Sequence, residues 1–431
     1  MRLKNKKVLV YGLGDSGRAV VKILREHLAY VSFYDDNPQY LEYVGFERNP
    51  YDKHFDLVII SPGVKCLGNP LLESFLQRKI PVISELDFAF SLSKGMIIAI
   101  TGTNGKTTVS MLTNKILKEA GYQTFLCGNI GLPFSAICEK TKKESVIVCE
   151  VSNFQLETSK IFAPHIACIL NIKPDHLDRH GTFDEYVKTK AKIAQNLKRR
   201  DVLILNLDDQ VARSLNLHKK EQFFTKKVLK KGVFVSNGQI YVNKNRIIGI
   251  DKIPLKGEKN LENVLASVAI CSHFKVSNED FQKAIESFSL ASHRMEIVGQ
   301  ISGVTYVDDS KATNVSSVIA CVEAFKDERI VLLMGGKSKN IDYNEFFSLD
   351  FNIKEVVCFG EDGPNIQKCA TEHNYNCAIF KKFDDATLYA INQAKSGDFV
   401  LLSPACSSFD EFSSYAERGD RFKTIVLGSA K

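Results

Sequence analysis

A short glycine-containing loop between an apolar run and a helical pattern constrains the fold of this chain most. Residues 97–100 are Ile-Ile-Ala-Ile, residues 101–108 are Thr-Gly-Thr-Asn-Gly-Lys-Thr-Thr, and a helical pattern follows. The N–H groups of such a loop bind phosphate oxygens, the next helix adds positive potential at its N-terminus, and Lys106 adds a full charge. The Thr107 hydroxyl can ligate Mg²⁺. The pattern predicts a strand–loop–helix unit that binds a nucleoside triphosphate, with ATP as the expected nucleotide.

The spacing within this loop differs from the common Walker motif. That motif has a glycine five residues before Gly105, but residue 100 is Ile and the nearest preceding glycine is Gly102. The loop is therefore a shorter variant. From the residues alone, a plain strand–turn–helix connection with a chance Gly-Lys-Thr stays open as the alternative.

Strand and helix patterns alternate along most of the chain, which is typical of α/β domains. A length of 431 residues suggests about three domains, which we expect at 1–92, 93–290 and 291–431. In the first segment the patterns predict strands at 8–11, 31–34 and 57–60 and helices at 16–27 and 69–78. In the third segment they predict strands at 304–307, 330–334, 355–359, 378–380 and 399–403.

The second segment begins as a parallel α/β pattern and then changes character. The expected strands are 96–101, 123–127, 145–151, 166–171 and 202–206, with helices at 106–120 and 183–197. Residues 232–250 instead alternate in polarity around turn signals at 236–238 and 243–245, which predicts a small β meander. Helices at 261–273 and 278–288 are expected to close the segment.

The composition argues against several classes of function. The net charge is +7, and the lysine runs at 4–7 and 226–231 are short and lack interleaved aromatic residues, so we expect no nucleic-acid partner. The 11 cysteines include no Cys-x-x-Cys pair, which favours free thiols in a reducing cytosol. No apolar run is long enough for a signal-peptide core or a membrane span, so the sequence predicts a cytoplasmic protein without a membrane partner.

A second glycine-rich turn follows the first expected strand. Residues 12–17 read Gly-Leu-Gly-Asp-Ser-Gly, and Asp35 ends the next strand 18 residues after Gly17. This spacing matches a dinucleotide fingerprint, which would serve a nicotinamide cofactor or another diphosphate such as a UDP group. A tight turn that allows a helix to pack closely on its strand is the alternative.

Polar residues follow other expected strands, at the edge where parallel α/β sheets bind ligands. Glu150 ends the strand at 145–151, and a carboxylate beside a phosphate loop is suited to Mg²⁺. The Asp and His residues of 171–181 suggest a second cation site or phosphate contacts. Further polar clusters occur at 308–314, 335–339 and 403–410. Capped turns and solvated surface are the alternatives for each cluster.

Taken together, these segments resemble the Mur ligase family, which builds the peptide stem of bacterial peptidoglycan. The resemblance covers nearly the whole chain, with motifs in all three segments in the expected order. Those motifs are residues 101–108, Asn-Ile-Gly-Leu-Pro at 129–133, residues 150–157, Asp-His-Leu-Asp at 175–178, His-Arg at 293–294, Asp-Ser-Lys-Ala-Thr-Asn at 309–314 and Ser-Pro-Ala-Cys-Ser-Ser at 403–408.

The resemblance implies a fold, a reaction and a set of partners. The fold is an N-terminal Rossmann-like domain for UDP, a central P-loop ATPase-like parallel sheet with a small β meander, and a C-terminal Rossmann-like domain that closes over the site. The implied reaction adds D-glutamate to UDP-N-acetylmuramoyl-L-alanine through an acyl phosphate, with ATP and Mg²⁺ and no macromolecular partner, in a monomer. A sister ligase for another amino acid, or a folylpolyglutamate-type ligase, is the nearest alternative. A nicotinamide-linked oxidoreductase and a non-catalytic nucleotide-binding module are alternatives of other classes.

The resemblance also implies roles for individual residues. The expected catalytic residues are Lys106, Glu150, His176 and Lys190. The expected ATP contacts are Gly102, Thr103, Asn104, Gly105, Lys106, Thr107, Thr108, Asn260, Asn263, Arg294, Asp309 and Lys311. The expected contacts to the UDP-linked substrate are Gly12, Gly14, Asp15, Ser16, Gly17, Asp35, Asn129 and Gln155, and those to D-glutamate are Thr313, Lys339, Ser408 and Phe409.

The implied metal ligands are Thr107, Glu150, His176 and Lys190. A lysine cation cannot ligate a metal, so the family's carbamylation of the matching lysine is implied for Lys190. Lys192 is two residues away, and the choice depends on the Tyr186-x-x-x-Lys190 spacing. Lys337 likewise stays open beside Lys339. Lys259 precedes Asn260 where family members often have His, which weakens the implied adenine contacts.

Overall fold

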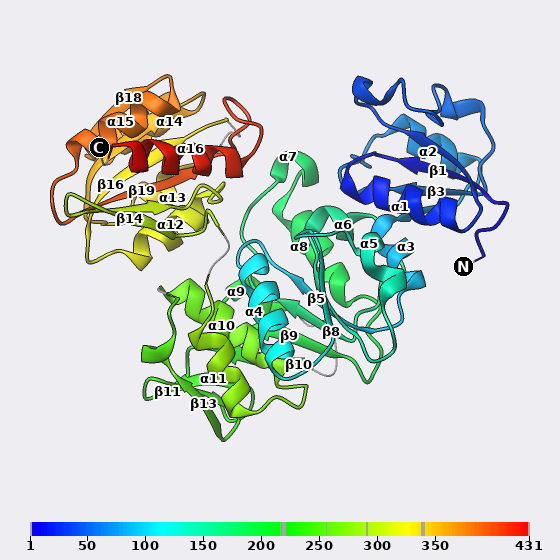
Figure 1. Ribbon diagram of the computed structural model, residues 1–431, viewed down its shortest axis with the longest axis horizontal. Coiled ribbons are helices and arrows are strands. Elements are labelled where there is room, and N and C mark those ends of the chain that lie inside the picture. Colours follow the sequence, from blue (N-terminus) through cyan, green and yellow to red (C-terminus); the bar gives the residue numbers. More distant parts are fainter. Residues whose placement is uncertain are drawn as a thin grey trace. The chain divides into compact units, whose positions relative to one another are not determined.

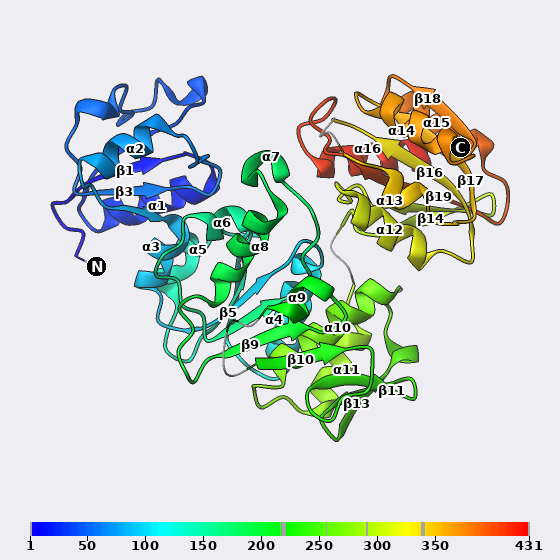
Figure 2. The ribbon, with the colours of Figure 1, turned by 180° about the vertical axis from the view of Figure 1, so that it is seen from behind.

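Three β-sheets with helices packed on them organise the described part of the chain (Figures 1 and 2). The computed structural model describes residues 2–215, 217, 221–255, 257–289, 292–337 and 341–429. The first two sheets belong to one compact unit, Met1–Ile253 with Glu262–Phe288. The third belongs to a second unit, Pro254–Leu261 with Ser289–Lys431. Most strand pairs are parallel, so the predicted α/β class is confirmed.

The first sheet is a parallel four-stranded sheet of order β2-β1-β3-β4. Its strands are β1 (Lys7–Tyr11), β2 (Tyr30–Tyr34), β3 (Leu57–Ile60) and β4 (Val82–Ser84), and its helices are α1 (Asp15–Glu26), α2 (Pro70–Gln77) and α3 (Glu85–Leu92). All four residues of β3 are buried, as expected for a strand covered on both faces. The strand β4 escaped prediction because three residues show no usable periodicity.

The second sheet has the order β13-β12-β11-β10-β9-β8-β5-β7-β6. The strands from β11 (Val233–Ser236) to β6 (Thr124–Gly128) are parallel. Between them lie β10 (Glu221–Thr225), β9 (Val202–Asn206), β8 (Ile166–Ile169), β5 (Met96–Thr101) and β7 (Val146–Glu150). The strands β12 (Gln239–Val242) and β13 (Asn245–Gly249) add antiparallel pairs, which confirms the predicted meander.

The helices of this second sheet carry several of the predicted site residues. They are α4 (Lys106–Glu119), α5 (Phe134–Ile137), α6 (Asn153–Glu157), α7 (Leu177–His180), α8 (Phe183–Ala191), α9 (Gln210–Ser214), α10 (Glu258–Cys271) and α11 (Asn278–Glu286). The predicted helix at 183–197 ends earlier, because Lys192–Ala194 is a 3-10 turn. One continuous apolar core joins the first two sheets through residues such as Leu86, Phe134 and Phe162. Among the described helices, none has the length and apolar character needed to cross a membrane.

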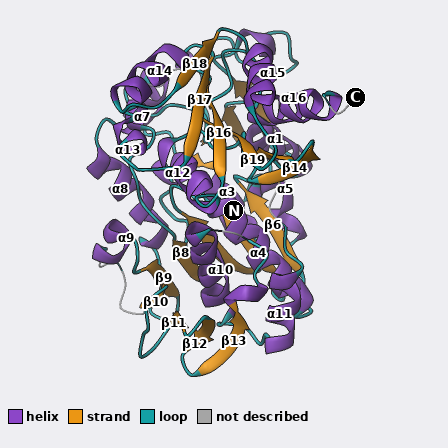
Figure 3. Cartoon of the chain, turned by 90° about the vertical axis from the view of Figure 1, so that its left-hand side faces the viewer, coloured by secondary structure: helices purple, strands orange, loops and turns teal. Residues whose placement is uncertain are grey.

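The third sheet has the order β14-β15-β19-β16-β17-β18, with apolar cores on both faces. Its strands are β14 (Glu296–Ile301), β15 (Val304–Asp308), β16 (Arg329–Gly335), β17 (Ile353–Phe359), β18 (Cys377–Phe380) and β19 (Asp398–Ala405). Its helices are α12 (Val315–Ala324), α13 (Asn344–Phe347), α14 (Gly363–Glu372), α15 (Phe383–Gln393) and α16 (Tyr415–Gly428). The strands β16 and β17 lie side by side (Figure 3). The sequence analysis missed β14, which is antiparallel to β15 and only partly buried.

Candidate active site

The predicted phosphate loop connects β5 to α4, and the segment after β8 fixes its shape. The N–H groups of Thr103 and Asn104 donate to the backbone oxygen and the Oδ1 atom of Asn171, at 2.9 and 2.8 Å. Gly105 has φ +84°, and a Cβ atom there would lie 2.2 Å from Oδ1 of Asn263. Only glycine tolerates both conditions. The loop is therefore a defined structure with Asn263 beside it, and not an arbitrary turn.

Two lysine side chains meet at one backbone oxygen of this loop. Lys106 Nζ donates to the carbonyl oxygens of Gly102 at 2.9 Å and Thr103 at 2.8 Å. Lys190 Nζ, on α8, donates to the same Gly102 oxygen at 2.8 Å and lies 4.6 Å from the centre of the Tyr186 ring. Lys190 is buried, and its burial, with the nearby charge of Lys106, holds the pKa of its amine well below the usual range. The site therefore favours a neutral amine at Lys190. By contrast, Lys192 Nζ donates to the Glu157 carbonyl at 2.7 Å.

Glu150 ends β7, as predicted, and among the described residues one of its carboxylate oxygens has no hydrogen-bond partner. Its Oε1 atom accepts a hydrogen bond of 2.8 Å from Asn129 Nδ2. Its Oε2 atom is buried and unpartnered. A buried carboxylate oxygen without a donor is costly unless a cation binds it. The group therefore fits the expected Mg²⁺ site, as does the buried Thr107 hydroxyl group.

His176 has an uncommon backbone conformation, and two neighbouring side chains contact its ring. It precedes α7 with φ 52° and ψ 36°, in the left-handed region. Its ring packs edge-on against Phe154 with centroids 4.8 Å apart, and its Nε2 atom lies 3.6 Å from Oδ2 of Asp175. The ring is therefore placed by packing and by a carboxylate. Its role at a second metal ion stays a prediction.

A cavity of about 580 Å³ lies where the first two sheets adjoin. It brings together seven of the eight residues predicted for the UDP-linked substrate: Gly12, Gly14, Asp15, Ser16, Asp35, Asn129 and Gln155. Residues from both the N-terminal and the central segments therefore share one wall. Gln155 also accepts hydrogen bonds from Ser152 in a capping box at the start of α6, which holds its side chain in place.

Gly17 does not line this cavity. A glycine is needed there because α1 packs closely on the turn after β1. A Cβ atom at Gly17 would lie 1.8 Å from the Gly12 carbonyl oxygen, so a larger residue would separate α1 from its strand. Asp35 Oδ2 accepts a hydrogen bond of 2.6 Å from the N–H group of Leu13, so Asp35 shapes the glycine turn as well as the cavity.

The sequence analysis missed one wall of the cavity. Residues 61–64, Ser-Pro-Gly-Val, follow β3 and line the cavity beside the glycine turn. The Ser61 hydroxyl donates to the Gly12 carbonyl at 2.7 Å, which links the two turns. The signal was present in the sequence, because a Ser-Pro-Gly turn ends a fully apolar strand at the binding edge of a parallel sheet.

In the second unit, the remaining predicted site residues lie near the ends of β15 and β19. Asp309 is buried, and its carboxylate accepts hydrogen bonds from Ser403 Oγ at 2.9 Å and the Met295 N–H group at 3.2 Å. Burial raises the pKa of Asp309 to about 7. Lys311 Nζ lies 4.9 Å from the centre of the Tyr415 ring. The other residues of the set are Arg294, Thr313, Ser408, Phe409 and, at the start of α10, Asn260.

Of the residues considered for D-glutamate, the structure describes Thr313, Lys337, Ser408 and Phe409 but not Lys339. Lys339 lies outside the described residues, so its predicted contact with D-glutamate stays a prediction. Lys337 pairs with Glu361 at 2.5 Å on the surface. Ser408 is buried after β19, whereas the adjacent Phe409 side chain is 70% exposed and available to a ligand.

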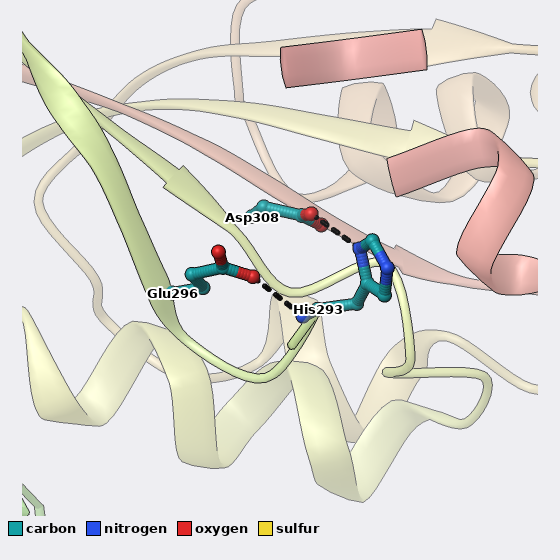
Figure 4. Close-up of side chains that lie close together, drawn as sticks. All are labelled: His293, Glu296 and Asp308. Carbon is teal, nitrogen blue, oxygen red and sulfur yellow. Dashed lines mark hydrogen bonds and ion pairs between the residues drawn. The ribbon is translucent and has the colours of Figure 1, made fainter. Parts of the chain in front are cut away.

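Three side chains of the types that bind metal ions lie close together in the second unit, with a lysine ammonium group beside them. His293, Glu296 and Asp308 place ligand-type atoms within 4.8 Å of one another (Figure 4). His293 Nδ1 lies 2.7 Å from Asp308 Oδ2, and Glu296 accepts from the His293 N–H group at 2.8 Å. Lys423 Nζ donates to Glu296 at 2.7 Å and lies 3.7 Å from Asp308. Because Lys423 already supplies a cation, we interpret the group as an ion-pair network that holds the segment containing Arg294.

A buried arginine that the sequence analysis missed holds the loops of the second unit. Arg418, on α16, is fully buried. Its guanidinium group donates to the carbonyl oxygens of Ser310 at 2.9 Å and Cys406 at 3.0 Å, and to those of Gly335 and Ser407 at 3.4 Å. These carbonyl groups belong to the last residue of β16 and to the segments after β15 and β19. A single arginine in a helical pattern gives no sequence signal for such a role.

Comparisons with known families and proteins agree with this geometry. Residues 100–271 match the Mur ligase middle domain, and residues 293–406 match the Mur ligase glutamate ligase domain. Solved structures with the same fold include a UDP-N-acetylmuramate–alanine ligase of Thermotoga maritima, at TM-score 0.63 and 19% identity over 99% of this chain and all of that one. A MurF ligase of the same organism in complex with ADP has TM-score 0.62 and 17% identity over 99% and 96%. The chain belongs to the Mur ligase family.

Within that family, three relatives that match over nearly the full length of both chains share one name. It is 38% identical to the UDP-N-acetylmuramoylalanine–D-glutamate ligase of Alkaliphilus metalliredigens over 99% of both chains. It is 39% identical to that of Pelotomaculum thermopropionicum over 99% of this chain and 98% of the relative. It is 33% identical to that of Streptococcus thermophilus over the same shares.

Proposed function

We propose that this protein is an ATP-dependent ligase that joins D-glutamate to UDP-N-acetylmuramoyl-L-alanine in peptidoglycan precursor synthesis. One observation supports this most directly. Asn129 lines the large cavity and also bonds to Glu150, whose free carboxylate oxygen suits a cation. A substrate whose UDP end binds at the glycine turn could therefore extend its carboxylate toward the phosphate loop.

The proposed reaction has two steps, each with a plain chemical requirement. The substrate carboxylate attacks the γ-phosphorus of ATP, which forms an acyl phosphate and releases ADP. The D-glutamate amine then attacks the acyl carbon, and phosphate leaves as the amide bond forms and the amine loses a proton. All three substrates are anionic, so cations must offset the charge. Lys106 and the N–H groups of residues 102–108 would bind the phosphates.

The buried groups near the loop suit the divalent ion that such a transfer needs. Glu150 and Thr107 would hold Mg²⁺, and His176 with carbamylated Lys190 would hold a second ion. When bound, these ions would neutralise charge on the transferring phosphoryl group. A neutral amine is the form of lysine that reacts with CO₂, and the lowered pKa of Lys190 favours that form.

The amino acid would be selected by residues of the second unit. Thr313, Lys339, Ser408 and Phe409 would bind D-glutamate, and Arg294, Asp309 and Lys311 would contact ATP, as would Asn260. We retain the division at 1–92, 93–290 and 291–431 for these roles. We also infer a monomer that acts in the cytoplasm on small molecules alone. Light scattering of the purified protein would test the monomer.

A panel of amino acids tests the proposal. We expect ADP release from ATP with Mg²⁺, UDP-N-acetylmuramoyl-L-alanine and D-glutamate, and a product whose mass is that of the amide. L-glutamate, D-alanine and L-lysine serve as controls and should give background release. A sister ligase would show the same dependence on ATP with another amino acid. No ADP release with any amino acid would overturn the proposal.

A further inference from the structure

Arg179 connects structural elements of the first two sheets at the wall of the large cavity. Its Nε atom donates to Oε2 of Glu157 on α6 at 2.8 Å. Its Nη2 atom donates to the carbonyl oxygen of Val64 at 2.8 Å and lies 3.4 Å from that of Pro62. Its guanidinium carbon lies 4.4 Å from the centre of the Phe154 ring. One side chain therefore contacts α6 of the central segment and the turn after β3.

The turn that Arg179 contacts is a wall of the cavity, and its first residue, Ser61, is also bonded to the backbone oxygens of Gly12 and Tyr11. Ser61, Pro62, Gly63 and Val64 all line the cavity. Within the turn, the Val64 N–H group donates to the Ser61 carbonyl at 3.1 Å. The carbonyl groups of a turn need hydrogen-bond donors, either from water or from the protein. Arg179 supplies that donor from a different segment of the chain.

The chemistry of this contact needs arginine and not merely a cation. The guanidinium group is planar, so its Nε and Nη2 atoms donate in fixed directions while its face stacks on an aromatic ring. A lysine ammonium group offers no such fork. Glu157 pairs with the charge at 2.8 Å, and both side chains are mostly buried, at 13% and 17% exposure. The contribution of Arg179 is therefore mainly geometric.

We propose that Arg179 is a positioning residue for the UDP-linked substrate, an inference that rests on the proposed function of the cavity. Arg179 fixes the turn at 61–64 so that the cavity keeps the shape that the substrate requires. Arg179 also belongs to α7, which His176 directly precedes. The turn at the UDP end and the residue expected at the metal are thus held by one short helix. Substrate that orders the turn should also order His176.

Binding of UDP to the full chain, measured by calorimetry without ATP, tests this inference. We expect Arg179→Ala to weaken UDP binding by about tenfold or more, since the turn loses its donor. Arg179→Lys should recover little, because lysine lacks the fork. Arg213→Ala, an exposed arginine on α9, is the matched control and should bind UDP like the unmodified chain. Glu157→Gln keeps Arg179 but removes the charge that orients it, so it should weaken UDP binding by an intermediate amount.

Two further readouts separate positioning from a general loss of structure. In hydrogen exchange, Arg179→Ala should expose the amides of residues 61–65 while those of β3 stay protected. In steady-state kinetics, KM for the UDP-linked substrate should rise about tenfold while KM for ATP changes less than about twofold. Melting curves identify any variant that does not fold, in which case Glu157→Gln carries the test.

The outcomes distinguish this inference from the proposed function. If the unmodified chain binds UDP and Arg179→Ala and Glu157→Gln bind it equally well, the inference is wrong and the ligase assignment stands. Uniform exchange throughout the first unit of Arg179→Ala would likewise refute a specific role. If the unmodified chain does not bind UDP at all, both the inference and the substrate assigned to the cavity are overturned.

Discussion

Lys106 and Lys190 donate hydrogen bonds to the same carbonyl oxygen, that of Gly102, although they come from different helices. Two ammonium groups at one acceptor repel each other, and Lys190 is the more buried of the two. The arrangement is therefore more stable when the Lys190 amine is neutral. Carbamylation would replace the cation with an anion beside Lys106, which turns repulsion into attraction.

Replacing Lys190 with Ala should remove ligation, and small acids should restore part of it. We expect the rate of ADP release to fall by ~10²–10³-fold, since an oxygen ligand of the second metal ion is lost. Acetate or formate can enter the space left by the side chain and supply a carboxylate. Lys192→Ala is the control and should keep most of the activity, because Lys192 points to the Glu157 carbonyl. No rescue in a variant with a normal melting curve would count against carbamylation.

Replacing Glu150 with Gln should raise the Mg²⁺ concentration that half-saturates the reaction. Glutamine can keep the hydrogen bond with Asn129 but presents no charge at the free oxygen position. Loss of one metal ligand should weaken the ion's binding by ~10–100-fold. ADP release measured over a range of Mg²⁺ concentrations checks this. The exposed Glu144→Gln should leave the titration unchanged, and an unchanged titration for Glu150→Gln would mean that this carboxylate holds no metal.

Asp309 should make the protein less stable as the pH rises from about 4 to about 7. Burial raises its pKa to about 7 from an ordinary value of 3.8, so the native state holds a proton that the unfolded chain releases across this range. Above that range, both states are ionised and the penalty is constant. Asp309→Asn should therefore gain at least ~1 kcal/mol more over the unmodified chain at pH 8 than at pH 5.

Thermal melts of the two proteins at pH 5 and pH 8 check the Asp309 prediction. The control is Asp385→Asn, an exposed carboxylate on α15 for which the same comparison should show no pH-dependent difference. An equal effect of Asp309→Asn at both pH values would show that the native carboxylate is already ionised at pH 5.

Replacing Arg418 with Met should destabilise the second unit strongly. The substitution removes the Arg418 donors from carbonyl groups at the ends of three strands, at a cost of about 1 kcal/mol or more for each. We expect a loss of ~3 kcal/mol in denaturant unfolding. The matched control is Arg421→Met on the same helix, whose exposed pair with Asp384 should be worth less than about 1 kcal/mol. Similar losses in the free energy of unfolding for the two variants would show that the hydrogen bonds of Arg418 do not stabilise the second unit.

Much of this protein follows from local sequence. The apolar runs of β1, β3, β5 and β9 predicted buried strands, and the helical pattern that follows each of them favoured parallel pairing. The glycines of 102–105 and 12–17 predicted where phosphates could bind, and two of them, Gly12 and Gly105, have positive φ that few other residues tolerate. Short or half-exposed strands such as β4 and β14 gave no such signal, because periodicity needs length and burial.

Only the tertiary structure decided which distant groups meet. No spacing in the sequence relates Lys190 to Gly102, Arg179 to Val64 or Arg418 to Cys406, because each contact joins segments that the fold brings together from different strands. The sequence named the residue types that phosphate and metal chemistry requires. Their burial, which sets the pKa of Lys190 and leaves one Glu150 oxygen for a cation, exists only once the sheets have packed.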